Sequence, residues 1–359
     1  MREPIVLSAS EVVARLDDFN AILDARSPSE YALDHLPGAI NAAVLDDAQR
    51  AEVGTVNAEQ GAFEAKRLGA GLVAQNIGQL IATRFAHHGR DWKPLVYCWR
   101  GGQRSGSLAT VMARIGWHTS VMEGGYRAFR RYVIDDLSQR APAIPWMVVA
   151  GRTGSAKSRL LQALAQAGEQ VLDLEDLARH RGSVLGAWPG DPQPAQKHFE
   201  TCVWDALRRF DLRRPVFVES ESRKIGQCQV PEPLIHAMRA STVVVIEADV
   251  AVRSRFLLDE YVHFRSDPPG LMRMLDKLIA LHGAERVAQW RSLIEADQWD
   301  TLVERLLREH YDPSYDRSMQ RNFTRLEQAA TVTLPGADAP GIAQAVQSLI
   351  ALAAAQTAD

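Results

Sequence analysis

The chain has few cysteines, and it has no long run of apolar residues. Only 3 of its 359 residues are cysteines; they lie far apart and form no CxxC pair. This spacing argues against a disulfide framework and against a zinc site, and the histidines also lack metal-ligand spacing, so we predict no resident metal. No apolar stretch is long enough to cross a bilayer. We therefore expect a protein of the reducing cytoplasm that has no membrane partner.

The chain also lacks an excess of charge of either sign. Its 41 lysines and arginines against 44 aspartates and glutamates give a formal net charge of −3, which does not by itself indicate a nucleic-acid-binding protein. Arginines nevertheless cluster at 127–131 and 208–214. Phosphate contacts need a basic face rather than a basic total, so these clusters are compatible with RNA binding, although each alone is more simply a solvated helix face.

The length and the apolar runs predict two α/β domains. The first covers residues 1–140, where short strands alternate with helices. It includes a strand at 94–97 and a helix at 105–115, which Gly116 is expected to end. A linker is predicted at 141–145, where two prolines disfavour regular structure.

Residues 146–359 predict a second domain built on a parallel sheet. Apolar strands separated by helices are typical of such a sheet when helices cover both of its faces. A helix is expected at 157–167, and residues 270–328 predict a helical subdomain. The predicted strands lie at 146–150, 170–174, 215–218, 242–246 and 331–334.

Cys98 ends an apolar strand and is followed by a glycine-rich loop and then by a helix. The residues that follow it are Trp99, Arg100, Gly101, Gly102, Gln103, Arg104 and Ser105. Such a loop can direct backbone N–H groups and a helix N-terminus at one point in front of the sulfur. These groups and the charges of Arg100 and Arg104 favour the thiolate, which is the nucleophilic form. We therefore predict that Cys98 is catalytic, together with both arginines, in sulfur, selenium or phosphate chemistry.

The first 140 residues resemble a rhodanese-homology domain. The resemblance rests on the run from Asp24 to Tyr31, on the run from His35 to Asn41, and on the Cys98 loop. In that family the cysteine carries a persulfide, which the N–H groups of the loop cradle. Five residues separate Cys98 from Arg104, one more than in ordinary sulfurtransferase loops and as many as in phosphatase relatives of the fold. The wider cradle predicts a tetrahedral oxyanion such as phosphate, thiophosphate or selenophosphate.

A second loop for phosphate begins where the strand 146–150 ends. Its residues are Gly151, Arg152, Thr153, Gly154, Ser155, Ala156, Lys157 and Ser158. A glycine-rich loop that follows a strand and opens a helix with Lys-Ser is the pattern of a P-loop. Backbone N–H groups would cradle phosphate, Lys157 would neutralise it, and the Ser158 hydroxyl would hold Mg²⁺. Ala156 stands where the pattern has glycine, and its methyl group disfavours a positive φ.

Further charged residues follow other strands of the second domain. The candidates are Arg181, Glu219, Glu221, Arg223, Lys224 and Asp249. Glu219 or Asp249 would supply the acid that binds magnesium in nucleotide triphosphatases. Arg181 follows the second strand, at the edge where doubly wound sheets bind ligands. Because basic residues lie beside these acids, a diphosphate ester fits the set as well as ATP does.

Together, the two domains resemble the family of bacterial tRNA 2-selenouridine synthases, also described as geranyl-2-thiouridine synthases. Besides the Cys98 loop and the P-loop, the match includes the runs 180–183 and 219–226, and the order of the domains is its most specific part. The resemblance implies a tRNA with a wobble 2-thiouridine as partner, geranyl diphosphate and selenophosphate as substrates, and no bound organic cofactor. Geranylation of the sulfur would precede its replacement by selenium, with Lys157 serving the first step and Cys98 the second.

Two alternatives remain open on the residues alone. One is a sulfurtransferase fused to a kinase that depends on ATP or GTP, which predicts nucleotide hydrolysis and indifference to prenyl diphosphates. The other is a non-catalytic rhodanese module that senses redox state, which predicts that Lys157 is dispensable. Trp99 is equally a candidate for stacking on the wobble base, for contact with the prenyl chain, and for simple packing under the loop.

Overall fold

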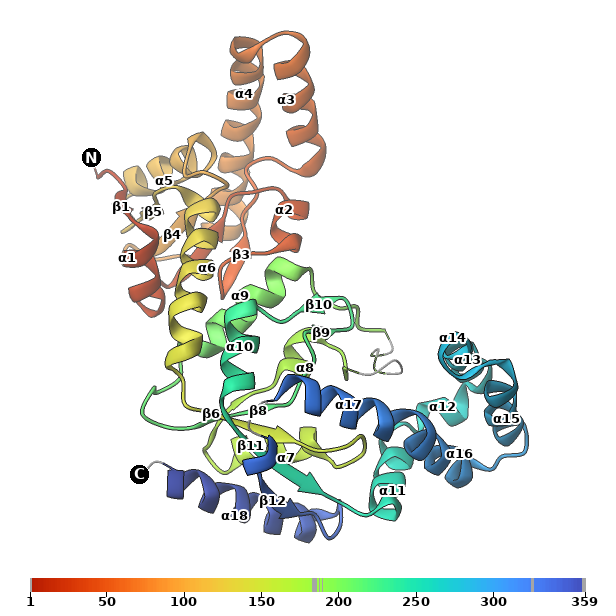
Figure 1. Cartoon of the computed structure of the whole chain (residues 1–359). Helices are drawn as coiled ribbons and strands as arrows, with labels where there is room; N and C mark the ends of the chain where they lie inside the picture. The colour runs from red at the N-terminus through yellow and green to blue at the C-terminus, as the bar shows by residue number, and fades with distance from the viewer. Residues whose placement is uncertain (1, 183–185, 187, 189, 324–325, 357–359) are drawn as a thin grey trace. The chain divides into compact units, whose positions relative to one another are not determined.

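The computed structural model describes residues 2–182, 186, 188, 190–323 and 326–356, which belong to two compact units (Figure 1). The first unit consists of Met1–Leu137 with Pro194–Asp205, and the second of Ser138–Gln193 with Ala206–Asp359. Each unit has a five-stranded sheet, and the paired strands of these two sheets run parallel. The predicted fold class, two α/β units with parallel sheets, is confirmed.

The sheet of the first unit has the strand order β1-β5-β4-β2-β3. Its strands are β1 (Ile5–Leu7), β2 (Ala21–Asp24), β3 (Ala39–Asn41), β4 (Pro94–Tyr97) and β5 (Ser120–Met122). The helices are α1 (Ala9–Ala14), α2 (Pro28–Leu33), α3 (Asp47–Glu59), α4 (Ala62–Leu80), α5 (Gln103–Ile115), α6 (Gly125–Ala143) and α9 (Gln196–Leu207). Strand β4 lies in the middle and is buried at every position, as its apolar sequence predicts. Gly116 ends α5 with a φ of +119°, which confirms its predicted role.

The linker predicted at 141–145 is wrong over its first three residues. Helix α6 continues to Ala143 and includes Pro142. In the last turn of a helix, carbonyl groups lack partners within the helix. Here the indole N–H of Trp146 donates a hydrogen bond of 2.8 Å to the Ala141 carbonyl. The helix therefore keeps a satisfied end despite the proline, and only residues 144 and 145 separate it from the next strand.

The sheet of the second unit has the strand order β12-β11-β6-β8-β7. Its strands are β6 (Trp146–Ala150), β7 (Gln170–Leu172), β8 (Val216–Glu219), β11 (Thr242–Glu247) and β12 (Ala330–Thr333), and β9 (Lys224–Ile225) and β10 (Cys228–Gln229) form a separate hairpin. The helices α7 (Lys157–Gln166), α8 (Leu174–Ala178), α10 (Glu232–Ala240) and α18 (Ala339–Gln356) accompany this sheet. Strand β7 ends two residues earlier than predicted because the Asp173 carboxylate accepts a hydrogen bond from the Asp176 N–H and caps α8.

A helical subdomain lies between β11 and β12 in the sequence. It consists of α11 (Val250–Glu260), α12 (His263–Ser266), α13 (Pro268–Asp276), α14 (Ile279–His282), α15 (Ala284–Glu295), α16 (Trp299–Leu306), the π-helix η3 (Leu307–Tyr311) and α17 (Asp312–Asn322). It has its own apolar core, which includes Leu275, Trp290 and Leu302. The helices begin earlier than the predicted segment, because α11 already starts at Val250.

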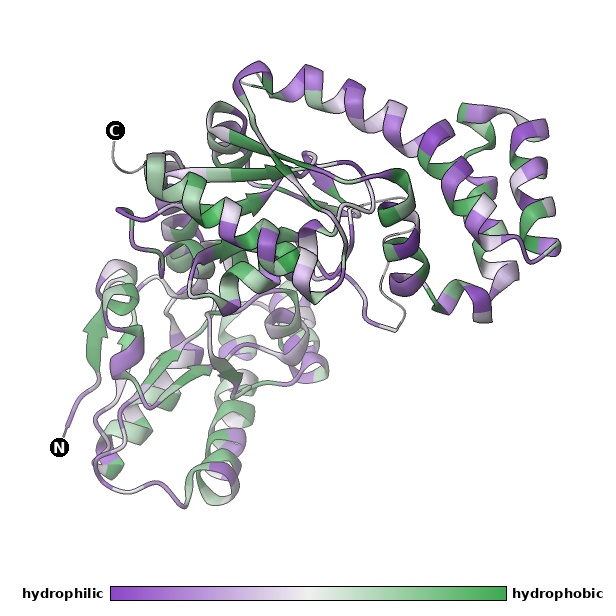
Figure 2. Cartoon of the chain, turned by 90° about the horizontal axis from the view of Figure 1, so that it is seen from below, coloured by the Kyte–Doolittle hydropathy of each residue, from purple (hydrophilic) through white to green (hydrophobic). Residues whose placement is uncertain are grey.

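Figure 2 shows the strands of the two sheets as mainly hydrophobic, whereas the helices carry both hydrophilic and hydrophobic residues. This distribution agrees with helices that pack one face on a buried sheet. Among the described residues, no helix has both the length and the hydropathy that a membrane span requires.

Candidate functional sites

Cys98 lies directly after β4, at the carboxyl edge of the first sheet. It is only 3% exposed, and the Ser105 hydroxyl donates a hydrogen bond of 3.0 Å to its sulfur. An O–H donor stabilises negative charge on the sulfur, and so does the N-terminus of the 13-residue helix α5, which starts five residues further on. The structure therefore places the predicted nucleophile beside a hydrogen-bond donor and close in sequence to the start of a helix.

The Cys98 loop is held by the first turn of α6. The N–H of Tyr126 donates to the Cys98 carbonyl over 2.8 Å, and the N–H of Arg127 donates to the Trp99 carbonyl over 3.1 Å. Gly101 has a φ of +65°, and a Cβ atom there would lie 2.8 Å from the Met122 carbonyl oxygen. Only glycine fits this close approach, which explains Gly101; a Cβ atom at Gly102 would meet open space.

The other predicted residues of this loop lie in different surroundings. Trp99 is half-buried and stacks on Tyr126, with 5.3 Å between the ring centres, so packing is one of its roles. Arg100, Gly102 and Gln103 are exposed. Arg104 forms an ion pair of 2.7 Å with Glu30 of α2, so this guanidinium ties the start of α5 to α2.

A buried polar cluster around Asp34, which was not predicted from the sequence, is connected to the loop through Tyr126. Asp34 is fully buried, and its carboxylate accepts hydrogen bonds from Tyr126 (2.8 Å) and from Thr201 of α9 (3.0 Å). His198 of α9 lies 3.4 Å from the other carboxylate oxygen, an ion-pair distance. Asp34 and Cys202 together raise the pKa of His198 to about 9. The same Tyr126 thus connects Trp99 with α9.

The pH dependence of folding tests this cluster. An unfolded histidine titrates near pH 6.5, whereas the pKa of His198 is about 9 in the fold. Its charge therefore stabilises the fold fully below about pH 6.5, and this contribution disappears as the pH rises through about 9. We expect the wild type to lose about 1 kcal/mol more stability than His198→Asn between pH 6 and 9.5, measured by urea unfolding. His236→Asn, at a mostly exposed histidine, is the matched control; equal pH profiles for the wild type and His198→Asn would contradict the interpretation.

The second phosphate loop connects β6 to α7, as predicted. Ala156 adopts a φ of +53° and is buried, so the backbone keeps the conformation that glycine usually supplies and bears the strain of a methyl group there. The Lys157 ammonium donates a hydrogen bond of 2.7 Å to the Gly151 carbonyl. Arg152 pairs with Asp316 through two hydrogen bonds of 3.0 and 2.8 Å. The N–H of Gly151 donates to the Tyr315 hydroxyl over 2.6 Å.

Three carboxylates converge beside Lys157. One oxygen each of Glu175, Glu219 and Glu221 lies within 4.8 Å of the others, and the Lys157 ammonium is 3.4 Å from Glu219. Burial and the neighbouring carboxylates raise the pKa of Glu175 to about 9 and that of Glu221 to about 8. Burial alone would lower the pKa of Lys157, but Glu219 and its neighbours raise it overall.

This cluster suits a hard divalent cation. Carboxylate oxygens are the ligands that Mg²⁺ prefers, and the Ser158 hydroxyl lies at the same place, 3.1 Å from Glu175. Glu219, Glu221 and Ser158 were predicted as site residues, whereas Glu175 was not, although it lies in the polar run that follows β7. A bound cation would compensate the repulsion that keeps two of the carboxylates protonated near neutral pH.

Glu221→Gln should separate the electrostatic cost of this cluster from its affinity for metal. The carboxyl of Glu221 has a pKa of about 8 in the fold, well above its unfolded value, so ionisation destabilises the fold as the pH rises from about 4.5 to 8. Without metal, we expect the variant to be more stable than the wild type by about 1 kcal/mol at pH 8. Calorimetry should show that the Mg²⁺ affinity of the wild type rises with pH between 7 and 9, and that the variant binds Mg²⁺ at least tenfold more weakly than the wild type. Glu327→Gln controls for loss of a charge; unchanged Mg²⁺ affinity in Glu221→Gln would refute the assignment.

A cavity of about 550 Å³ contains Lys157, the acidic cluster and Arg181. The Arg181 guanidinium lies over the Tyr261 ring, 4.8 Å from its centre, and 3.4 Å from Glu260. The structure therefore places this predicted residue near the phosphate loop. Ser183, which belongs to the same sequence run, lies outside the described residues.

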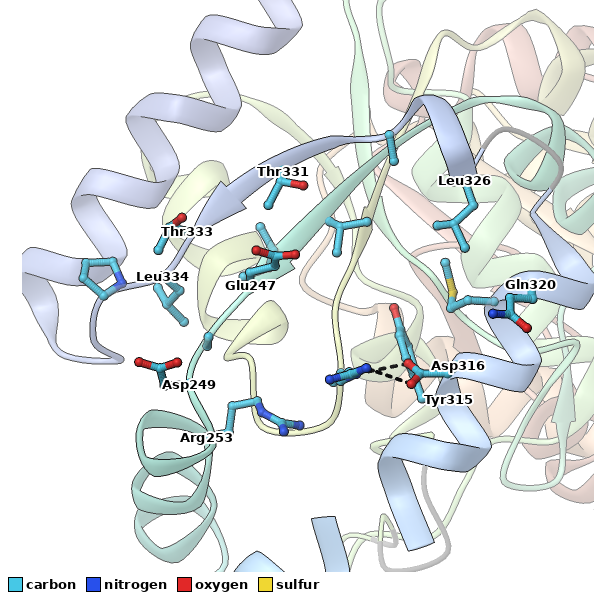
Figure 3. Close-up of a pocket in the computed structure, with 17 residues that line it drawn as sticks. Glu247, Asp249, Arg253, Tyr315, Asp316, Gln320, Leu326, Thr331, Thr333 and Leu334 are labelled. Carbon is cyan, nitrogen blue, oxygen red and sulfur yellow. Dashed lines mark hydrogen bonds and ion pairs between the residues drawn. The ribbon is translucent and has the colours of Figure 1, made fainter. Parts of the chain in front are cut away.

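Three other predicted residues lie away from this cavity in the described structure. Arg223 is exposed and pairs with Glu232 over 3.1 Å, and Lys224 is exposed on β9. Asp249 precedes α11 and lines a separate cavity of about 700 Å³, which Figure 3 shows between β11, β12 and α17. Arg152 also lines that second cavity, where it is joined to Asp316. Glu219 rather than Asp249 is therefore the acid beside Lys157.

Comparisons with known proteins match both units. A family model described as "Rhodanese-like domain" matches residues 8–132, and one described as "tRNA 2-selenouridine synthase AAA domain" matches residues 144–269. The chain is 31% identical over 332 residues to a tRNA 2-selenouridine synthase from Alcanivorax borkumensis, covering 84% of this chain and 90% of that protein. It is 32% identical over 337 residues to one from Cupriavidus necator, covering 85% and 90%. A third, from Nitrosomonas europaea, is 33% identical over 261 residues, covering 69% and 66%.

Proposed function

Since this chain belongs to the family of tRNA 2-selenouridine synthases, we propose that it is a tRNA-modifying transferase that converts a wobble 2-thiouridine into 2-selenouridine. In the proposed route, geranyl diphosphate first alkylates the sulfur, and selenophosphate then supplies the selenium. The observation that carries the proposal is the presence, in one chain, of the Cys98 loop and of a P-loop whose Lys157 lies in a large polar cavity.

The second unit would perform the geranylation. The sulfur of 2-thiouridine attacks carbon 1 of the geranyl group, a carbon–sulfur bond forms, and the carbon–oxygen bond to diphosphate breaks. The departing diphosphate gathers negative charge, which the Lys157 ammonium and the N–H groups of the loop can stabilise. Where Mg²⁺ binds the acidic cluster, it supplies further positive charge to the leaving group. Arg181 adds charge at the same cavity.

The first unit would perform the selenation. Alkylation turns the sulfur into a better leaving group. The selenium of selenophosphate can then add at carbon 2 while geranylthiolate departs, and water cleaves the selenium–phosphorus bond to release phosphate and leave 2-selenouridine. Cys98, with the Ser105 hydroxyl on its sulfur and helix α5 in front, is the group that would hold the selenium donor. The five residues between Cys98 and Arg104 support a cradle for a tetrahedral oxyanion, but Arg104 is already paired with Glu30. Arg100 is therefore the better candidate for direct contact.

The two variants Cys98→Ala and Lys157→Met should separate the two steps. The protein is incubated with 2-thiouridine tRNA, geranyl diphosphate and selenophosphate, and the nucleosides are then analysed by mass spectrometry. We expect Cys98→Ala to accumulate geranylated tRNA without selenated product. Lys157→Met should lose geranylation by about 100-fold, the effect of removing one donor to a developing oxyanion.

Lys277→Met is the control for loss of a lysine, since Lys277 lies in the helical subdomain outside the cavity. Equal loss of geranylation and selenation in Cys98→Ala would refute the division of labour. Absence of both modified nucleosides with the wild type would refute the proposed function, and hydrolysis of ATP or GTP without them would favour the kinase alternative.

A further inference from the structure

The helical subdomain contains an apolar pocket of about 70 Å³ beside the phosphate loop. Its walls come from α11, α12, α16 and η3 and include Leu257, Leu258, Phe264, Trp299, Val303 and Leu306. Polar groups are scarce in this lining. A phosphate or a nucleotide base would find few hydrogen-bond partners here, so the lining favours a hydrocarbon.

The apolar pocket adjoins the polar cavity around Lys157. Four residues line both of them: Thr153, Leu257, Tyr261 and Tyr311. Thr153 belongs to the phosphate loop itself, and its carbonyl accepts a hydrogen bond of 3.1 Å from Arg253, which anchors the loop at this point. Arg181, over the Tyr261 ring, places positive charge where the two spaces meet. A site that suits an anion and a site that suits a hydrocarbon therefore share these four lining residues.

We propose that this pocket binds the hydrocarbon chain of a prenyl diphosphate whose diphosphate lies at the phosphate loop; this inference rests on the proposed function. Ligands with a charged head and an apolar tail match both halves of the shared site, and burial of each CH₂ group contributes about 0.8 kcal/mol. The chain would pass Tyr261 and Tyr311, which line both spaces, and its far end would lie between α11 and α16.

The size of the pocket limits the length of the chain. A cavity of about 150 Å³ holds a benzene molecule, and this pocket is about 70 Å³. It therefore accepts only the end of a chain, while the remainder lies in the larger cavity. A short prenyl group fits this arrangement, whereas a chain with an additional isoprene unit would have to displace Leu302 and Leu306, which belong to the core of the subdomain. The pocket is thus a determinant of chain length.

A matched pair of valine substitutions tests the assignment. Val303 lines the pocket from α16 and is half-buried, whereas Val262, between α11 and α12, is 59% exposed and lies outside the pocket lining. Calorimetry would measure the binding of inorganic diphosphate and of dimethylallyl, geranyl and farnesyl diphosphates to the wild type, to Val303→Phe and to Val262→Phe. Inorganic diphosphate reports on the phosphate loop alone, so it also shows that each variant is folded.

For the wild type we expect geranyl diphosphate to bind at least about tenfold more tightly than dimethylallyl diphosphate, with no further gain for farnesyl. Val303→Phe should reduce this preference to less than about twofold without changing the affinity for inorganic diphosphate, and Val262→Phe should retain the wild-type preference. A full preference for geranyl in Val303→Phe would overturn the inference, as would equal binding of all chains by the wild type.

Failure of the pocket assignment can be distinguished from failure of the proposed function. If the chain preference depends on Val303 but no geranyl group reaches tRNA, the pocket assignment stands and the proposed transfer fails. If transfer occurs but the preference is unaffected by Val303→Phe, the transfer stands and the pocket assignment fails.

Discussion

The charge interaction between the half-buried Lys157 and three carboxylates is the interaction on which the polar end of the second sheet depends. Glu175, Glu219 and Glu221 converge there, and like charges at such distances destabilise one another in a buried site. Lys157 neutralises part of this charge, and protonation of Glu175 and Glu221 accounts for more, since their pKa values are about 9 and 8. Without ligand, the negative charge of the three carboxylates is thus compensated by protons and by one lysine.

Ligand binding must change the partners of Lys157 and the protonation of the carboxylates. In the structure Lys157 donates to the Gly151 carbonyl and lies near Glu219, so a phosphate in the loop would compete with both partners for the same ammonium. A divalent cation on the carboxylates would release Lys157 toward the phosphate and would allow the two protonated acids to ionise. Phosphate and cation should therefore bind cooperatively, because each compensates the charge that the other leaves unpaired.

The two sites arise from the same local architecture, and that part could be predicted from the sequence. Cys98 and Gly151 both follow a central, buried parallel strand, and a helix begins within seven residues of each. The apolar runs and the glycines between strand and helix are local signals, and β4, β6 and the start of α7 therefore agree with the predicted residues. Residues 141–143 of the predicted linker are helical instead. The hydrogen bond from Trp146 to the Ala141 carbonyl at this helix end is a contact that the helix propensity of Pro142 does not reveal.

The parts that could not be predicted depend on contacts between distant positions. Glu175 joins Glu219 because Asp173 ends β7 early and caps α8, a shift of two residues that the apolar pattern does not show. The Asp34 cluster depends on Thr201, 167 positions away.

Helix α9 lies in sequence between two strands of the second sheet, yet its residues up to Asp205 belong to the compact first unit. No boundary near residue 140 separates this chain cleanly, because a fragment that ends there keeps the fully buried Asp34 but loses Thr201 and His198. A buried carboxylate deprived of these partners is costly, so the first unit depends on a segment that the rhodanese pattern alone does not include.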